Sequence, residues 1–485
     1  MSTAIDDGVG FRSRRGPILI ALMLATGLVA IDATIVATAV PSIVEDIGGF
    51  ASFPWLFSAY LLAQAVSVPV YAKLSDVVGR KPMILGGIGL FLLGSILCGL
   101  AWSMPALIAF RVLQGLGAGA VQPVAITIAG DIYTLAERAK VQGYLASVWA
   151  VSSVVGPTLG GVFASLGIWR WIFLINIPLC LLAGWMLLRT FHENVERTKH
   201  RIDYLGAGLL TISLSLLILG ALQGGQAWAW DSTISICVFA GGAVLFVAFL
   251  LVERKVAEPI LPPWVVSRRL LATTAMISFG VGAVMLGLTT YVPTFLEGSL
   301  KTSPLLAGLA LAALTIGWPI SASQAGRLYL RIGFRNTASI GIAITVIGAA
   351  VLALTASTPS ILLVAMACFI VGLGLGLVAT PSLIAAQTSV EWNERGVVTG
   401  TNLFARSIGS SIGVAVFGAI ANAIYASSPS GGPDPETTTH ASSAVFLAVL
   451  VSAVLTVVAV LVMPADRKRS SDAPAREPSS EPAND

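Results

Sequence analysis

The sequence predicts an all-α integral membrane protein with fourteen transmembrane helices, arranged as two six-helix pseudo-repeat bundles plus two inserted helices. Three observations predict this fold class. The composition is strongly apolar, because 56% of the 485 residues are hydrophobic and 11% are charged, whereas soluble domains contain roughly 45–50% apolar residues. The apolar residues lie in long continuous runs, and the chain carries an internal repeat in a single register.

The apolar runs have the length of transmembrane helices. A helix needs about 20 apolar residues to cross a hydrocarbon core of about 30 Å. Strands of a transmembrane barrel would instead alternate over about ten residues, and these runs are continuous. The first run contains Asp32, which distinguishes it from a cleavable signal peptide. The fourteen runs are 17–40, 53–72, 83–101, 105–130, 141–166, 171–189, 204–223, 232–252, 271–296, 304–325, 337–356, 360–387, 397–425 and 441–463.

The positions of lysine and arginine predict the orientation. Short cytoplasmic loops of membrane proteins are enriched in these two residues. With a cytoplasmic amino terminus, 24 of the 28 Lys and Arg residues fall on the cytoplasmic side. Arg170 and Lys301 fall outside, and Arg111 and Arg406 lie within spans. We therefore expect a multi-pass protein of the cell (plasma or inner) membrane with both termini in the cytoplasm.

An internal repeat divides the chain. The segment GLGAGAV, which begins at Gly115, is echoed by GLGLGLV at Gly372, and Glu137-Arg138 matches Glu394-Arg395 at the same offset of 257. Similarity among glycine-rich helices does not explain the shared Glu-Arg pair. Related halves with a site between them are typical of secondary transporters. The expected parts are a cytoplasmic tail 1–16, a six-helix bundle 17–189, a linker with two inserted helices 190–269, a six-helix bundle 270–463 and a disordered cytoplasmic tail 464–485.

The composition also argues against several classes of site. The net charge of +4 is too small to indicate nucleic acid as a partner. The three histidines lie in polar connections and the four cysteines in apolar runs, so we expect no metal site and no disulfide framework. An intramembrane enzyme would need a nucleophile with a base, and a sensor would need a soluble signalling domain. We therefore expect the protein not to be an enzyme.

Two ionisable residues inside predicted spans are expected to meet. A charged group in the hydrocarbon core is costly, so such a residue is a candidate functional residue. Asp32 lies about 22 Å into the first span, and Arg111 lies about 9 Å into the fourth span from the opposite side. Both would reach a similar depth. As neighbours, they could control when the carboxyl group holds a proton, or they could form a static ion pair between two helices.

The polar connection YAKLSDVVGRKP, residues 71–82, is expected to contain a conformational latch. Acidic residues contribute little to topology, so orientation does not explain Asp76. The fourth span covers about 39 Å and returns Asp131 to the same face. We expect Arg80 to bridge Asp76 and Asp131, with Gly79 forming the turn.

Five motifs in chain order carry a family resemblance. They are LVAIDATIVATAVP in the first span, AKLSDVVGRKP after the second, RVLQGLGAGA in the fourth, VVGPTLGG in the fifth and WRWIFLINIP at the sixth. With the fourteen spans, they are similar to the major facilitator superfamily and, within it, to the fourteen-helix drug:proton antiporter branch. The resemblance covers nearly the whole chain. It implies that Asp32 and Arg111 couple transport to protons and that Asp76, Arg80 and Asp131 form the latch.

Small residues recur along one side of the fifth span. They would let another helix approach closely, and a proline there removes a backbone donor and favours a bend. Tight packing alone would explain such a stripe, but the resemblance implies the packing of an antiporter helix. The residues concerned are Ser152, Gly156, Pro157, Gly160 and Gly161.

Polar and aromatic side chains in other spans are candidates for a mostly apolar substrate cavity. Any single aromatic residue can equally serve in packing or in the interfacial belt. Arg406 could face the cavity, bind a carbonyl group or snorkel toward the cytoplasm, and the sequence favours none of these. The candidates are Tyr60, Gln64, Gln114, Trp149, Tyr291, Trp318, Asn402 and Arg406.

The expected function is export of hydrophobic or amphipathic small molecules, such as drugs, in exchange for protons. The proton gradient would supply the energy and no cofactor is needed. We expect a monomer that alternates between two open states in the lipid bilayer. An exporter of lipid, siderophore or another endogenous amphipathic metabolite is the alternative on this fold. A membrane sensor or an intramembrane enzyme is a more remote one.

Overall fold

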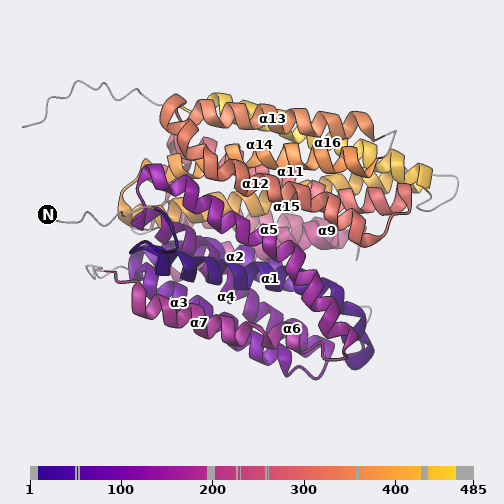
Figure 1. The fold of residues 1–485 in the computed structure, drawn as a ribbon, viewed down its shortest axis with the longest axis horizontal. Coiled ribbons are helices and arrows are strands. Elements are labelled where there is room, and N and C mark those ends of the chain that lie inside the picture. Colours follow the sequence, from indigo (N-terminus) through magenta and orange to yellow (C-terminus); the bar gives the residue numbers. More distant parts are fainter. Residues whose placement is uncertain are drawn as a thin grey trace, which may run out of the picture.

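The computed structural model describes residues 9–49, 52, 55–193, 203–224, 228–229, 231–256, 259, 262–356, 360–427 and 435–465. Residues 1–8 of the predicted amino-terminal tail and 466–485 of the predicted disordered tail lie outside the described residues. The described chain is helical and contains no β-sheet (Figure 1). Its helices are α1 Gly16–Ile47, α2 Trp55–Val78, α3 Arg80–Gly99, α4 Met104–Ile132, α5 Leu135–Ser165, α6 Trp171–Leu174, α7 Asn176–Thr190, α8 Tyr204–Gln223, α9 Thr233–Glu253, α10 Pro263–Ser267, α11 Arg269–Leu300, α12 Pro304–Ile332, α13 Phe334–Thr355, α14 Ile361–Thr388, η2 Trp392–Glu394, α15 Arg395–Ser427 and α16 Pro435–Val462.

The predicted membrane-spanning class is confirmed. Thirteen helical stretches of the described chain are long and apolar enough to cross a membrane. The remaining predicted span corresponds to α8, whose apolar stretch Leu205–Gly220 is shorter than the others. The sixth span is interrupted between α6 and α7. Pro178 explains the interruption, because it has no N–H to donate to the carbonyl group of Leu174, where α6 ends.

The fifth span begins earlier than its apolar run. The run suggested a start at residue 141, whereas α5 begins at Leu135. A capping box stabilises this polar start, because the Glu137 carboxylate accepts a hydrogen bond from the Thr134 backbone N–H at 2.9 Å. Arg15, just before α1, pairs with Glu137 at 2.9 Å and fastens the two helix starts together.

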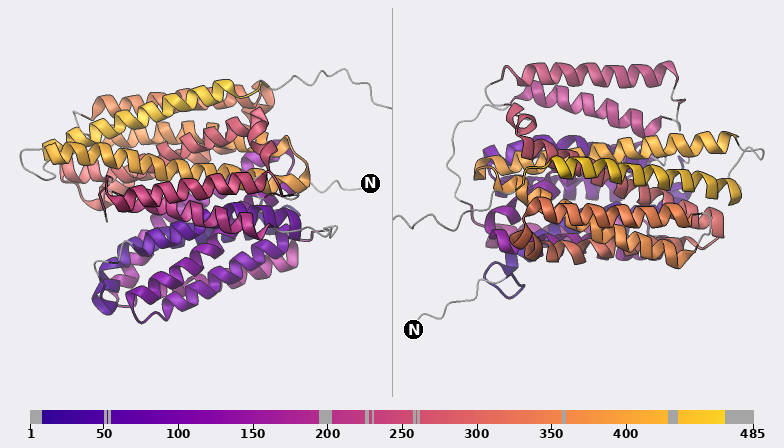
Figure 2. Two further views of the ribbon diagram at one scale, coloured as in Figure 1. Left: turned by 180° about the vertical axis from the view of Figure 1, so that it is seen from behind. Right: turned by 90° about the horizontal axis from the view of Figure 1, so that it is seen from above.

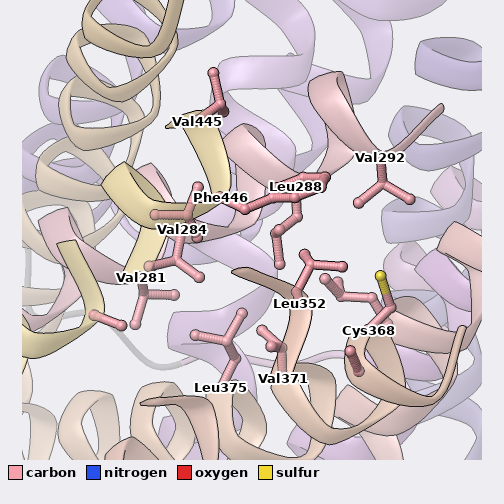
Figure 3. Packing of buried hydrophobic residues seen from close by; sticks show 14 of the residues in the cluster. Val281, Val284, Leu288, Val292, Leu352, Cys368, Val371, Leu375, Val445 and Phe446 are labelled. Carbon is pink, nitrogen blue, oxygen red and sulfur yellow. The ribbon is translucent and has the colours of Figure 1, made fainter. Parts of the chain in front are cut away.

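The two halves repeat one packing pattern. In the first half α1 packs on α5, and both α2 and α3 pack on α4; in the second half α11 packs on α15, and both α12 and α13 pack on α14. Each half has its own hydrophobic core. In the second half, apolar side chains of α11, α13, α14 and α16 interdigitate, as Figure 3 shows around Leu288, Leu352 and Phe446. The domain limits themselves stay a prediction.

The inserted pair lies to one side of the halves. Helices α8 and α9 pack against each other, and α8 also contacts α2 and α15 (Figure 2, right). Helices α5 and α12 pack together on the opposite outer face, in front in Figure 1. The two halves therefore meet along two seams, α2 with α15 and α5 with α12.

Candidate functional site

Asp32 of α1 and Arg111 of α4 form an ion pair inside the first bundle. Arg111 Nη1 lies 2.5 Å from Asp32 Oδ2, and the two side chains are 0% and 1% exposed. Gln114 of α4 donates from Nε2 to Asp32 Oδ1 at 2.7 Å and accepts from Arg111 Nη1 at 2.8 Å. Both carboxylate oxygens therefore have donors, which offset the cost of burying the charge.

One further helix, α7, reaches the same carboxylate, and α3 contacts the amides that surround it. Asn176 of α7 donates from Nδ2 to Asp32 Oδ1 at 3.3 Å and to Ser95 Oγ of α3 at 3.3 Å. Ser95 Oγ also accepts from Gln114 Nε2 at 2.8 Å. Sequence reasoning missed Ser95 and Asn176, although both are polar residues in apolar runs and Asn176 lies in the motif WRWIFLINIP. Helices α1, α3, α4 and α7 thus meet in one hydrogen-bonded cluster around the Asp32 carboxylate.

Tyr60 and Gln114 border this ion pair. The Arg111 guanidinium lies 4.0 Å from the centre of the Tyr60 ring, and Arg111 Nε donates to the Leu56 carbonyl at 3.2 Å. Tyr60 is 1% and Gln114 is 0% exposed. We expected both in a substrate cavity. In the structure both contact Arg111 instead. The aromatic face of Tyr60 and the amide oxygen of Gln114 stabilise the buried cation.

The loop between α2 and α3 forms the expected bridge. Arg80 Nη2 lies 2.7 Å from Asp76 Oδ1, and Arg80 Nε lies 3.1 Å from Asp131 Oδ2. The Arg80 side chain is 0% exposed. Gly79 has φ +108°, a conformation that favours glycine and turns the chain between α2 and α3. The network therefore joins α2, α3 and α4.

The network also crosses to the second half, which the sequence did not reveal. Asp76 accepts hydrogen bonds from the backbone N–H groups of Gly396 at 2.9 Å and Val397 at 2.8 Å. These belong to the first turn of α15, where free N–H groups favour an anion. Asp131 accepts from Arg395 Nη1 at 2.9 Å. The shared Glu-Arg pair of the repeat was the available signal, because Arg395 is one of its members.

Glu193 completes this face of the molecule and was also missed. Its carboxylate accepts from the backbone N–H groups of Arg80 and Lys81, each at 2.9 Å. It thereby caps the start of α3, where backbone donors have no helical partner. Lys81 donates from Nζ to the Leu188 carbonyl at 2.9 Å. The end of α7 is therefore fastened to the latch.

The small residues of α5 pack against α1 within the first half. A side chain at Gly156 would meet Thr34 and Ile35, and one at Gly160 would meet Ile35 and Thr38. Thr34 Oγ1 donates to the Ser152 carbonyl at 3.0 Å, and Thr38 Oγ1 donates to the Pro157 carbonyl at 3.3 Å. Gly161 differs from the others, because a side chain there would meet no atom within 4 Å. The expected role of Gly161 in close packing is therefore wrong.

The remaining cavity candidates lie on α2, α5, α11, α12 and α15, in both halves. Gln64 and Trp149 are half-buried in the first half, where Trp149 packs on its core. Tyr291 and Trp318 pack on the core of the second half. Asn402 accepts from Ser278 Oγ at 2.8 Å, and its own amide donates to the Val398 carbonyl at 3.0 Å. A substrate cavity lined by these residues stays a prediction.

Arg406 is half-buried on α15. Within the described part of the chain its side chain has no recorded hydrogen bond or ion pair, whereas Arg80 and Arg111 are both paired. The structure therefore does not support a bound carbonyl group, one of the three alternatives left by the sequence.

An ion pair outside the membrane-spanning segments closes the other end of the first bundle. Arg170 Nη1 donates to Asp46 Oδ2 at 2.6 Å, and Trp169 Nε1 donates to the same oxygen at 3.0 Å. These hydrogen bonds, that of Arg170 first, lower the pKa of the Asp46 carboxyl from its ordinary value. They fasten the end of α1 to the connection between α5 and α6.

Comparisons with known proteins agree with this architecture. The Major Facilitator Superfamily profile matches residues 22–414. Multidrug resistance protein 3 of Bacillus subtilis (strain 168) is 36% identical over 410 residues, which are 84% of this chain and 80% of that protein. Multidrug transporter protein MdtP of the same strain is 34% identical over 414 residues, 85% of this chain and 76% of that protein.

A fungal relative and a solved structure extend the comparison. Efflux pump dotC of Dothistroma septosporum (strain NZE10 / CBS 128990) is 31% identical over 404 residues, 82% of this chain and 70% of that protein. The crystal structure of the human organic anion transporter MFSD10 (TETRAN) has a TM-score of 0.61 at 16% identity and covers 90% of this chain and 99% of that chain, which supports the fold alone. The family profile and the relatives above 30% identity show that this chain is a membrane transporter of the Major Facilitator Superfamily and not an enzyme.

Proposed function

We propose that this chain is a proton-coupled antiporter that exports hydrophobic or amphipathic small molecules, including drugs, from the cytoplasm. It resides in the cell membrane with both termini in the cytoplasm and functions as a monomer. The names of its bacterial relatives, a multidrug resistance protein and a multidrug transporter, support the substrate class. Proton entry from outside drives the cycle, so no cofactor is required.

The observation that carries the proposal is the buried carboxylate of Asp32. It is 0% exposed and receives hydrogen bonds from α4 and α7. A charged carboxylate only accepts hydrogen bonds, whereas a protonated one donates from one oxygen. A proton on Asp32 would therefore break part of its donor set and weaken the connection between these helices. Protonation is thereby coupled to helix arrangement.

The latch supplies the second element of an alternating-access cycle. The hydrogen bonds of Asp76, Asp131 and Arg80 to residues 392–397 hold the two halves together at the face that carries the α2–α3 loop. We assign this face to the cytoplasm, because it carries the basic connections. Release of these contacts would open the transporter inward for substrate loading.

The test is gradient-driven transport of the dye Hoechst 33342 in everted membrane vesicles. We expect Asp32→Asn to abolish accumulation driven by the proton gradient while the amount of folded protein is unchanged. Arg111 would keep its hydrogen bonds to Gln114 and Leu56, so the bundle retains partners for the cation. Glu45→Gln is the matched control, because it removes an exposed carboxylate from the same helix outside the cluster. Undiminished transport by Asp32→Asn would exclude the proposed coupling.

A further inference from the structure

A groove lies between α5 and α12. These two helices pack together on the outer face of the transporter that is in front in Figure 1. The groove has a volume of about 640 Å³ and is lined by residues of both halves. Neither the Asp32 cluster nor the latch contributes to it. The inserted helices lie on the opposite side of the molecule (Figure 2). The groove therefore faces the surrounding bilayer.

The groove is basic at one end and apolar at the other. Lys140 of α5 and Arg327 of α12 lie toward the face that carries the latch, and both are exposed. Toward the middle of the membrane the walls are Val151, Ile316 and Ile320, which are 60%, 46% and 49% exposed. This order matches the headgroup and the acyl chain of a lipid in the same leaflet.

The length of the groove also fits one leaflet. Eleven residues separate Lys140 from Val151 on α5, and eleven separate Ile316 from Arg327 on α12. At 1.5 Å per residue each wall is about 16 Å long. Half of a hydrocarbon core of about 30 Å is about 15 Å. The two basic side chains thus reach headgroup depth when the apolar walls lie in the acyl layer.

The charge of the groove favours an anion. No aspartate or glutamate lines it, and within the described residues neither Lys140 nor Arg327 has an ion pair. Arg327 donates only to Gln324, at 3.2 Å, a neutral partner that leaves most of its five N–H donors available. Two cations without acidic partners, one on each side of a groove, are electrostatically complementary to a phosphate group.

The floor of the groove is the contact between the halves. Gly143 approaches Ser323, Gly326 approaches Ala139, and Tyr329 donates a hydrogen bond to the Leu135 carbonyl. An occupant held by Lys140 of one half and Arg327 of the other would therefore span the seam. It would bind best when this end of the seam is closed, and so stabilise that arrangement.

We propose that the groove binds one anionic phospholipid of the cytoplasmic leaflet, with its phosphate between Lys140 and Arg327 and an acyl chain along Val151, Ile316 and Ile320. The bound lipid stabilises the closed arrangement of the α5–α12 seam. This proposal does not depend on proton coupling or on the transported substrate.

The experiment measures lipid bound to the purified full-length chain by native mass spectrometry. Phosphatidylglycerol and phosphatidylcholine with identical acyl chains are supplied in equal amounts. We expect the wild type to retain phosphatidylglycerol preferentially. The double variant K140Q/R327Q should lose this preference by roughly 25-fold, because each of the two basic residues near an anionic lipid surface contributes roughly fivefold to affinity.

Two controls separate the groove from general surface charge. The variant K140R/R327K keeps both cations and should keep the preference. The variant R254Q/K255Q removes two exposed cations from the end of α9, outside the groove, and should behave as wild type. An unchanged lipid ratio in K140Q/R327Q would overturn the proposal. If that variant instead lost only binding of Hoechst 33342, the groove would be a substrate path, which also overturns it.

Discussion

The guanidinium of Arg80 stacks on the indole ring of Trp392, 312 positions further along the chain. It lies 3.7 Å from the ring centre, and Nη2 donates to the Trp392 carbonyl at 2.6 Å. The same guanidinium contacts Asp76 and Asp131. One buried side chain therefore belongs to the latch within the first half and to the contact with the second half. Movement of either half changes its surroundings.

Trp392→Leu should shift the transporter toward the state in which this face is open. A cation–π contact contributes about 0.5–2 kcal/mol, so the shift should be roughly two- to thirtyfold. The readout is the maleimide labelling rate of Ala139→Cys, a buried position under Gly326 at the α5–α12 seam, which would open together with the latch. The background is Cys237→Ser, because Cys237 is the exposed cysteine of the described chain.

Trp264→Leu is the matched control for this measurement. It also removes a tryptophan that stacks on an arginine, since the Arg268 guanidinium lies 4.6 Å from its ring centre, but these two residues lie four positions apart in the predicted linker 190–269. We expect no change in labelling of Ala139→Cys. Equal labelling rates in Trp392→Leu and its parent would show that the stack does not hold the halves together.

Asp76→Asn should slow turnover while leaving substrate affinity unchanged within about twofold. The amide nitrogen of asparagine cannot accept a hydrogen bond, so one of the two backbone N–H groups at the start of α15 loses its partner. The charge partner of Arg80 is lost as well. We expect a decrease in turnover on the order of tenfold. Transport rates and equilibrium binding of Hoechst 33342 test this; a collapse of binding at unchanged turnover contradicts the latch.

Gly156→Ala should destabilise the first bundle, whereas Gly161→Ala should not. A methyl group at position 156 would collide with Thr34 and lie 3.2 Å from the Ile35 backbone nitrogen, whereas position 161 has no atom within 4 Å. Overpacking of this kind costs about 1–3 kcal/mol. Thermal unfolding in detergent compares the two variants, which carry the same chemical change on the same helix. Similar midpoints would mean that α1 and α5 adapt to the methyl group.

The Asp46–Arg170 contact should stabilise the protein at neutral pH but not in acid. The pKa of Asp46 is lowered from its ordinary value of 3.8 by the hydrogen bonds of Arg170 and Trp169. Its contribution is therefore present above pH 3.8 and lost as pH falls through the lower pKa of the folded protein. Asp46→Asn should have a lower Tm than wild type at about pH 7, and the difference should shrink as the pH falls below 3.8. A difference that is independent of pH would exclude this ion pair as its source.

Much of the fold could be predicted, because the requirement that the bilayer places on a segment depends on the residues of that segment alone. Every backbone group of a span must be paired inside it, so an apolar run of sufficient length becomes a helix. Local rules also placed the turn at Gly79 and the contacts of Asp32 with Arg111 and of Arg80 with Asp76 and Asp131. The predicted runs missed the polar start of α5, where Glu137 caps the helix, and the break before Asn176. The first position is set by helix capping and the second by the absence of a backbone N–H in proline. Neither effect can be seen in the distribution of hydrophobic residues.

The sequence by itself determined the membrane class, the repeated halves and the two charged clusters. The clusters could be found because a charged residue within an apolar run is costly and can be recognised from the sequence alone. Only the tertiary structure decided which groups satisfy those charges. Asn176 reaches Asp32 from α7, Ser95 of α3 accepts hydrogen bonds from Gln114 and Asn176, and residues 392–397 reach the latch from the second half. Such partners are selected by helix packing between distant segments. For the same reason Tyr60 of α2 became a neighbour of Arg111, whereas Gln114 lies three positions after Arg111 on α4 and meets it locally.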